Sequence, residues 1–198
     1  MDLFPPTAAL TPIPFDHGEL WMLRQLPLGA DNAVVMARLL AETAWRAHAI
    51  TLWGKPMLQP RLTAWYGDAN YTYSGLTMEA LPFPPLLQEI RLAVEAASGQ
   101  RFNSVLLNYY RNERDSMGMH SDDEAELGPA PVIASVSFGA TRTFILRHKR
   151  EKRSVKLDLP DGSMLLMAGQ TQANWQHGIN KSVRPIGPRI NLTFRFVC

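Results

Sequence analysis

The sequence predicts a mainly β protein of the α+β class, in which short strands form a double-stranded β-helix of the jelly-roll or cupin kind with helices packed outside. Short segments that alternate apolar and polar residues are separated by regular turn sequences, which is typical of strands. Two longer segments instead carry apolar residues at helical spacing. The candidate metal ligands lie on the strand-like segments. Together these observations favour a jelly roll whose strands carry the site.

The composition is that of one folded domain. A chain of 198 residues can bury a sizeable core, and a hydrophobic content of 46% excludes a disordered chain. We therefore expect residues 1–198 to form a single domain, and the protein to be a monomer. The formal net charge of +2 permits a polyanionic partner without requiring one.

Two further features bear on the cellular setting. The single cysteine, Cys198, excludes an internal disulfide and favours a reducing compartment. The chain shows neither a secretory leader nor an apolar run long enough to span a bilayer. We therefore expect a cytoplasmic protein with no membrane partner.

The N-terminal half is expected to supply packing. Residues 1–17 contain four prolines and little periodicity, which indicates an extended lead-in. Asp31 can cap a helix that continues to about Ala47. A second helix is expected to start at Pro84 and to end at Gly99. We expect the apolar faces of both helices to pack against the sheet.

A candidate metal site begins with His120 and Asp122. On an extended backbone, alternate side chains point the same way, so these two residues can reach one ion together. A third ligand must come from elsewhere in the chain, and His177 is the best candidate. Two imidazoles and one carboxylate form the site of non-haem Fe(II) oxygenases. By itself, a His-x-Asp motif more often marks a solvated turn.

The last strand-like segment, residues 188–197, raises the case for such a site. Its alternation places Arg189, Asn191, Thr193 and Arg195 on one face and apolar residues on the other. Two arginines shortly after the third ligand suit a dicarboxylate bound beside the metal, which implies 2-oxoglutarate. The alternative is an edge strand whose arginines lie in water.

These motifs together resemble the AlkB family of 2-oxoglutarate and Fe(II)-dependent nucleic-acid dealkylases. The family pattern is His-x-Asp, a distant His, and Arg-x-Asn-Leu-Thr-Phe-Arg, in that order. The resemblance extends from about Pro60 to the C-terminus and is closest to AlkB homologues two and three. Besides the metal and arginine motifs, it includes residues 60–67, 71–74, 103–113 and 135–144.

The resemblance implies roles for the catalytic core, expected at residues 102–198. His120, Asp122 and His177 would hold Fe(II) and form the catalytic centre, with 2-oxoglutarate and O2 as co-substrates. In the family, residues matching Asn108 and Tyr110 bind 2-oxoglutarate. The resemblance also implies 2-oxoglutarate contacts for Asn191 and Arg195, and assigns the distal carboxylate to Arg189, supported by Tyr110. The alternative for Asn108 and Tyr110 is a solvated polar pair.

Residues 50–75 are expected to recognise the nucleotide. Trp53, in Trp53-Gly54-Lys55, is similar to a finger of AlkB homologue two that fills the gap left by a flipped base. The alternative is a tryptophan packed in a hairpin. Tyr73 is the expected stacking ring and Tyr71 a hydrogen-bonding neighbour, whereas aromatic residues in strands are otherwise usually core.

Charged residues near the site give further expectations. Asp123 and Glu124 could favour a cationic methylated base over the neutral base, or they could form a solvated acidic loop. Arg142 is expected to touch phosphate, with an ion pair as the alternative. The basic run at residues 147–153 is either a solvated turn or a phosphate contact.

The resemblance implies oxidative removal of methyl groups from 1-methyladenine and 3-methylcytosine in alkylated DNA, with RNA as a further candidate. Succinate and formaldehyde would be released, and alkylation damage would be repaired. Three alternatives remain open at this point. They are a 2-oxoglutarate oxygenase acting on a protein or lipid, a nucleic-acid-binding module with an inactive site, and a zinc hydrolase.

Overall fold

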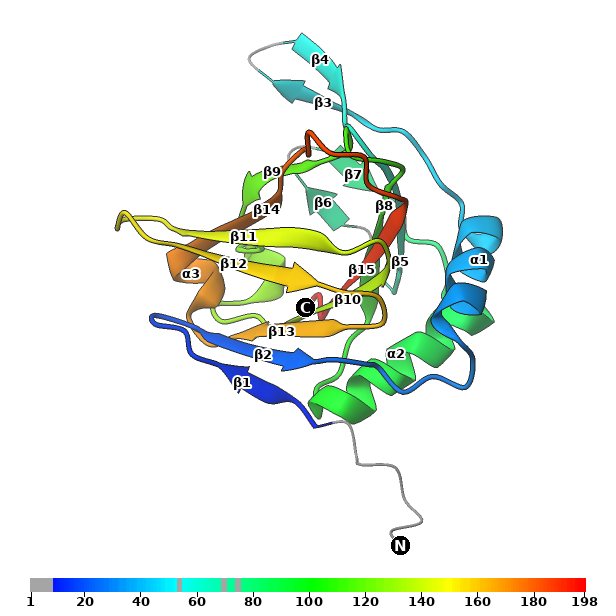
Figure 1. Ribbon diagram of the computed structural model, residues 1–198, viewed down its shortest axis with the longest axis horizontal. Helices are drawn as coiled ribbons and strands as arrows, with labels where there is room; N and C mark the ends of the chain where they lie inside the picture. The colour runs from blue at the N-terminus through cyan, green and yellow to red at the C-terminus, as the bar shows by residue number, and fades with distance from the viewer. Residues whose placement is uncertain (1–8, 53–54, 69–70, 74–75) are drawn as a thin grey trace, which may run out of the picture.

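The computed structural model describes residues 9–52, 55–68, 71–73 and 76–198, and most of its strands form two antiparallel sheets (Figure 1). The larger sheet has seven strands. In spatial order these are β1 (Thr11–Ile13), β2 (Glu19–Leu23), β13 (Met164–Ala168), β10 (Ile133–Gly139), β15 (Arg189–Arg195), β8 (Ser104–Tyr110) and β5 (Leu62–Gly67).

The smaller sheet has four strands, and two hairpins lie beside the sandwich at one end (Figure 1). In spatial order the smaller sheet consists of β12 (Ser154–Leu159), β11 (Arg142–His148), β14 (Trp175–Ile179) and β9 (Met117–His120). The hairpins are β3 (Ala49–Leu52) with β4 (Lys55–Leu58), and β6 (Tyr71–Tyr73) with β7 (Leu76–Met78). Two antiparallel sheets enclosing a core confirm the expected jelly-roll class.

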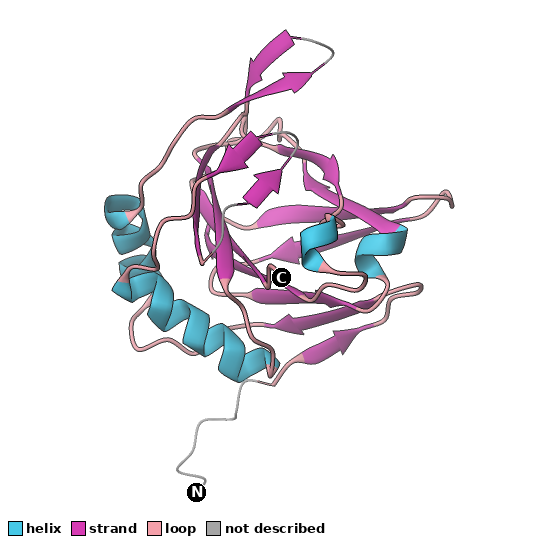
Figure 2. Ribbon diagram, turned by 180° about the vertical axis from the view of Figure 1, so that it is seen from behind, coloured by secondary structure: helices cyan, strands magenta, loops and turns pink. Residues whose placement is uncertain are grey.

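Two helices, α1 (Asn32–Glu42) and α2 (Pro85–Ser98), lie together on the outer face of the larger sheet (Figure 2). As expected, α2 ends at Gly99, which has a φ of 68° and donates its N–H to Glu95 O at 2.9 Å. The first helix is shorter than predicted: it ends at Glu42 and not near Ala47. The chain after it is drawn into an extended bridge with β5, between Arg46 and Thr63.

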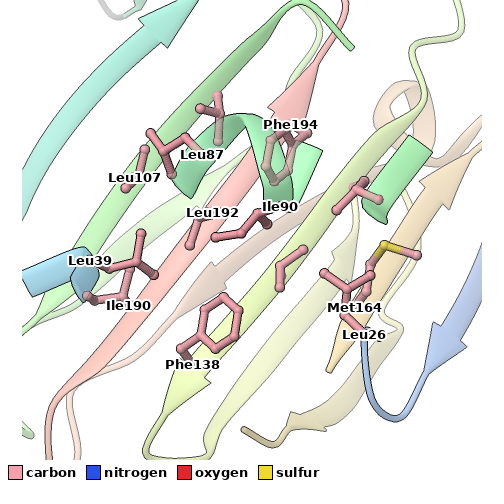
Figure 3. Packing of buried hydrophobic residues seen from close by; sticks show 14 of the residues in the cluster. Leu26, Leu39, Leu87, Ile90, Leu107, Phe138, Met164, Ile190, Leu192 and Phe194 are labelled. Atoms are coloured by element: carbon pink, nitrogen blue, oxygen red, sulfur yellow. The ribbon is translucent and has the colours of Figure 1, made fainter. Parts of the chain in front are cut away.

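The main core fills the space between these helices and the larger sheet (Figure 3). Leu87 and Ile90 of α2 pack with Leu107 of β8 and with Leu192 and Phe194 of β15, and each of these side chains is at most 1% exposed. Together they exclude water from the outer face of β8 and β15.

A second core lies between the two sheets. Leu106 of β8 and Leu165 of β13 face Phe144 and Leu146 of β11 and Trp175 of β14. The central strand β15 is therefore buried on both faces. Its expected alternation is confirmed, and its polar face points into the protein interior, which excludes the alternative of an edge strand whose arginines lie in water.

Two shorter helical segments, α3 (Thr171–Asn174) and the 3-10 turn η1 (Ala125–Leu127), lie near the smaller sheet. In the described part of the chain, no helix is both long and apolar enough to cross a bilayer.

Leu192→Ala should lower the free energy of unfolding by about 2 to 5 kcal/mol, because the truncation leaves a cavity in a core that cannot fully collapse. Urea denaturation provides the measurement. Leu92, on the outer side of α2 and 53% exposed, is the matched control. Leu92→Ala should change the free energy by no more than about 0.5 kcal/mol. Equal effects of the two substitutions would contradict the core assignment.

Candidate metal centre and cofactor pocket

The three expected ligands come together where β9 and β14 meet. His120 ends β9 and pairs directly with His177 of β14. Asp122 follows two residues later, and the ligand atoms of the three side chains all lie within 4.8 Å of one another. The imidazole rings are 4.3 Å apart between centroids, and His177 Nε2 is 3.7 Å from Asp122 Oδ2. The sequence prediction of this group therefore agrees with the geometry.

A glycine permits this close approach. Gly178 directly follows His177, and the register between β14 and β9 is irregular at this point. A Cβ at Gly178 would lie 2.8 Å from Met117 O and 3.0 Å from Gly118 O, distances that side-chain carbons do not tolerate. Only glycine lets β9 come near enough for its histidine to meet His177.

The protonation states in the cluster are those that a divalent cation requires. Burial raises the pKa of Asp122, but attraction from Arg195 and the two imidazoles outweighs it and lowers the pKa to about 2. Burial lowers the pKa of His177 to about 3, and the neighbouring His120 adds to the shift. The carboxylate is therefore ionised and the His177 ring neutral at pH 7.

Individual atoms are also suited to a metal. Asp122 Oδ2 is buried and accepts no hydrogen bond from the described residues. His120 Nδ1 lies 3.0 Å from Gly118 O, which can only accept, so Nδ1 carries the proton and Nε2 presents its lone pair. Two imidazole nitrogens and one carboxylate oxygen are a donor set for Fe(II). The residues present thus fit the ion that the sequence implies.

A second group, His17, His148 and Glu151, also has ligand atoms within 4.8 Å of one another. It is a poorer candidate. The backbone N–H groups of Arg150 and Glu151 already donate to His148 Nδ1, at 3.3 and 3.0 Å. The histidine thus holds the turn between β11 and β12.

The loop that carries Asp122 is fixed by three different contacts. Arg195 Nη2 donates to Asp122 Oδ1 at 2.6 Å, and both side chains are buried. The backbone N–H of Asp122 donates to Gln172 Oε1 at 2.9 Å, and Ser121 Oγ donates to Trp175 O at 3.0 Å. Sequence reasoning missed Gln172, since nothing in its local pattern links α3 to the metal loop.

A pocket beside the cluster is lined by Tyr110, Arg189, Asn191 and Arg195, together with the ligands. Arg189 is 1% exposed, and only its Nη2 has a hydrogen-bond partner among the described residues, Ser137 Oγ at 2.8 Å. Its Nε and Nη1 are buried without one. Burial lowers the pKa of Arg189 to about 10, so the group remains a cation.

These unpartnered N–H groups of a buried cation require an anionic acceptor, and a carboxylate provides one. The ring of Tyr110 lies 5.3 Å from the Arg189 guanidinium and supports it from one side. This arrangement fits the carboxylate of a small dianion bound next to the metal.

The two expected amide ligands are engaged within the protein. Asn191 Nδ2 donates to Ser135 Oγ at 2.8 Å and to Val136 O at 2.9 Å, while its side chain lines the pocket. Asn108 Oδ1 accepts from Arg61 Nε at 2.7 Å. Arg61 is a further buried cation that the site reasoning did not single out, although Pro60-Arg61 was one of the motifs in the resemblance.

The residues expected to contact substrate have different placements. Trp53 lies outside the described residues. Tyr71 and Tyr73 belong to β6, but their side chains lie outside the described part of the structure. Asp123 Oδ2 accepts from Lys149 Nζ at 2.9 Å, and the side chain of Asp123 is 56% exposed. Glu124, next in the chain, is partly buried.

The basic run at residues 147–153 is partly engaged inside the protein. Lys149 Nζ donates to Gln172 O at 2.8 Å as well as to Asp123. Arg153 pairs with Asp16 and Glu151. These contacts link the turn between β11 and β12 to the metal loop and to the N-terminal segment.

The expectation that Arg142 touches phosphate is corrected. Its side chain is 2% exposed, and its guanidinium donates to three backbone carbonyls, those of Asn112, Asp115 and Asn180. The guanidinium lies 5.6 Å from the centroid of the Tyr110 ring. Arg142 therefore joins loops inside the fold, and its position on β11 did not reveal which face it occupies.

Comparisons with known proteins agree with this geometry. Residues 25–195 match the family model described as the 2OG-Fe(II) oxygenase superfamily. The human "Alpha-ketoglutarate-dependent dioxygenase alkB homolog 3" is 44% identical over 173 residues, which cover 82% of this chain and 60% of that protein. The mouse "DNA oxidative demethylase ALKBH2" is 46% identical over 156 residues, covering 74% and 65%.

The chain thus spans less than two thirds of the length of these relatives. Among solved structures, that of OsALKBH1 superposes with a TM-score of 0.65 at 16% identity, covering 94% of this chain and 100% of the other. At that identity the match shows a shared fold.

Acid should destabilise the metal-free protein through the buried imidazole of His177. In the unfolded chain the His177 imidazole has a pKa near 6.5, whereas in the folded protein it stays neutral down to about pH 3. Protons therefore favour the unfolded chain as soon as the pH falls below 6.5. The contribution of His177 to the fall in the free energy of unfolding should approach about 1.4 kcal/mol per pH unit. Urea unfolding in EDTA from pH 7 to pH 5 measures it.

His177→Gln removes this group and should make the profile less steep by up to about 1.4 kcal/mol per pH unit. His17→Gln, at an exposed position, should leave the profile as in the wild type. A wild-type slope retained by His177→Gln would show that the ring is not held neutral.

Proposed function

The chain belongs to the 2OG-Fe(II) oxygenase superfamily and, within it, to the AlkB family, and we propose that it removes methyl groups oxidatively from the bases of alkylated nucleic acid. The substrates we favour are 1-methyladenine and 3-methylcytosine in DNA. The mouse relative ALKBH2, a DNA oxidative demethylase by name, supports DNA as the polymer. RNA is a further candidate.

The observation that carries this proposal is the adjacency of the metal cluster and Arg189. A buried carboxylate oxygen without a hydrogen bond and two buried guanidinium donors without acceptors line the same pocket, among the described residues. A cation bound by the carboxylate oxygen and a dianion bound by the guanidinium donors would satisfy both sets of buried polar atoms. Fe(II) and 2-oxoglutarate, the cofactors of the superfamily, have these charges.

The roles of the residues follow from their placement. His120, Asp122 and His177 would hold the iron, and Arg189, supported by Tyr110, would take the distal carboxylate of 2-oxoglutarate. When bound, the iron supplies the oxidising chemistry, in which O2 and 2-oxoglutarate are consumed, succinate and CO2 are formed and the N-methyl group is hydroxylated. The hydroxymethyl group then leaves the base nitrogen as formaldehyde.

The surrounding side chains exclude water from this chemistry. Phe144 stacks on His177 with ring centroids 5.2 Å apart, and Trp175 and Leu146 are at most 1% exposed. Arg195 holds Asp122 as an anion in this dry environment. The pocket at the centre therefore combines apolar walls, such as Phe144 and Ile179, with the polar side chains that would hold the co-substrate.

Selection of an alkylated base is proposed for the acidic residues after the metal loop. Methylation at N1 of adenine or N3 of cytosine makes the base cationic, and the carboxylates of Asp123 and Glu124 would favour that form. Tyr71 and Tyr73 remain proposed contacts for the flipped base, and Trp53 remains the residue proposed to fill the gap that the base leaves. The ion pair of Asp123 with Lys149 supports a fixed carboxylate orientation.

The test reconstitutes the protein anaerobically with Fe(II) and 2-oxoglutarate, adds air, and follows a short oligonucleotide bearing 1-methyladenine by mass spectrometry. Loss of the methyl group should require both additions. His120→Ala should abolish it, because one ligand is lost, whereas His17→Ala should retain wild-type activity.

Two outcomes would contradict the proposal. Succinate formation without demethylation would direct attention to a protein or lipid substrate. Demethylation at the wild-type rate by His120→Ala would contradict the assignment of His120 as a ligand of the catalytic metal.

A further inference from the structure

A second recess lies outside the metal pocket, at the free edge of β5. Three segments surround it: the extended chain after α1, β5 itself, and the chain between β7 and α2. Its volume is about 310 Å³, and none of the residues lining it lines the metal pocket. The side chains that shape it are Arg46, His48, Thr63, Trp65, Glu79 and Leu81.

Backbone hydrogen bonds fix both walls of this recess. Arg46 and Thr63 exchange two backbone hydrogen bonds of 2.9 Å, which attach the chain after α1 to β5. On the other side, Gly67 N donates to Leu81 O at 2.9 Å. The recess is therefore a built feature of the fold, shaped before any ligand arrives.

The side chains of Arg46 and His48 have no hydrogen-bond acceptor among the described residues, and Arg46 is exposed. Arg46 and His48 stand two positions apart on an extended segment, so both can face the same side. Glu79 also lines the recess, but it forms no ion pair with either within the described residues. Burial, followed by the proximity of Arg46, lowers the pKa of His48. Arg46 is therefore the cation of the recess, and His48 can donate a hydrogen bond as a neutral ring.

The location of the recess connects it to the nucleic-acid side of the molecule. Arg46 lies three residues before β3 begins, and Glu79 directly follows β7. The recess is thus lined by residues adjacent in sequence to both hairpins, β3–β4 and β6–β7, which overlap the expected nucleotide-recognition segment. A nucleic-acid strand that contacts those hairpins could therefore also reach the recess.

We propose that this recess binds one backbone phosphate of the nucleic-acid strand, with Arg46 as the principal contact and His48 as the second. The inference rests on the proposed function. It adds a second contact with the nucleic-acid strand, at a site remote from the reacting base. Such a contact positions the strand and carries no information about the base.

The experiment measures binding of a fluorescent single-stranded oligonucleotide by anisotropy as a function of KCl concentration. The proteins are the wild type, Arg46→Gln, His48→Gln and the control Arg101→Gln. Arg101 is exposed and lines a different recess, near the C-terminus. Each variant is used only after its urea unfolding curve matches that of the wild type.

Arg46→Gln should weaken binding about three- to tenfold at low salt. The slope of log K against log salt should become shallower by about 0.7, the value for one phosphate of a single strand. His48→Gln should show a smaller effect in the same direction. Both changes should be equal for methylated and unmethylated oligonucleotides, and Arg101→Gln should match the wild type.

An unchanged salt slope in Arg46→Gln, with wild-type demethylation intact, would overturn this inference alone. A wild type that neither binds the oligonucleotide nor demethylates it would overturn the proposed function with it. In a separate arm, inorganic phosphate is added in a thermal unfolding assay. If it stabilises the wild type but not Arg46→Gln, while the oligonucleotide slope stays unchanged, the recess is a site for free phosphate and the strand assignment is wrong.

Discussion

The buried ion pair between Asp122 and Arg195 is the interaction on which the rest of the site depends. Asp122 is fully buried, and a carboxylate in that environment would normally take up a proton and lose its value as a metal ligand. The guanidinium of Arg195, 2.6 Å away, instead holds it as an anion. Because the two residues are 73 positions apart, the fold must bring β15 to the metal loop before this ion pair can form. Loss of Arg195 would leave an uncompensated buried charge, which typically costs about 3 to 5 kcal/mol.

This pair explains why the polar face of β15 tolerates burial. A central strand packed on both faces usually carries apolar residues throughout, yet β15 places Arg189 and Arg195 in the interior. One arginine is compensated by Asp122. The other is not compensated within the described residues, and it lies where an anionic co-substrate would be held. A divalent cation and a dianion add no net charge to this interior, so the loaded site can remain dry.

Sequence patterns predicted the part of the site that depends on local alternation. His120 and Asp122 share a face because they are two apart on an extended chain, and the same rule predicted the polar face of β15. The burial of that face could not be predicted, since it depends on which sheet covers β15. Arg142 shows the same limit: its alternation indicates a strand, but the loops whose carbonyls surround it come from distant parts of the chain. Gln172 was missed for that reason too.

The most direct measurement compares two ligands on the anaerobic, Mn(II)-loaded protein by calorimetry: 2-oxoglutarate, and 2-oxopentanoate, which has the same chain length but no distal carboxylate. If the Arg189 guanidinium receives that carboxylate, 2-oxoglutarate should bind at least about 30-fold more tightly. Arg189→Gln should abolish most of the difference. Equal affinity of the wild type for both ligands would contradict the assignment of this pocket to a dicarboxylate beside the metal.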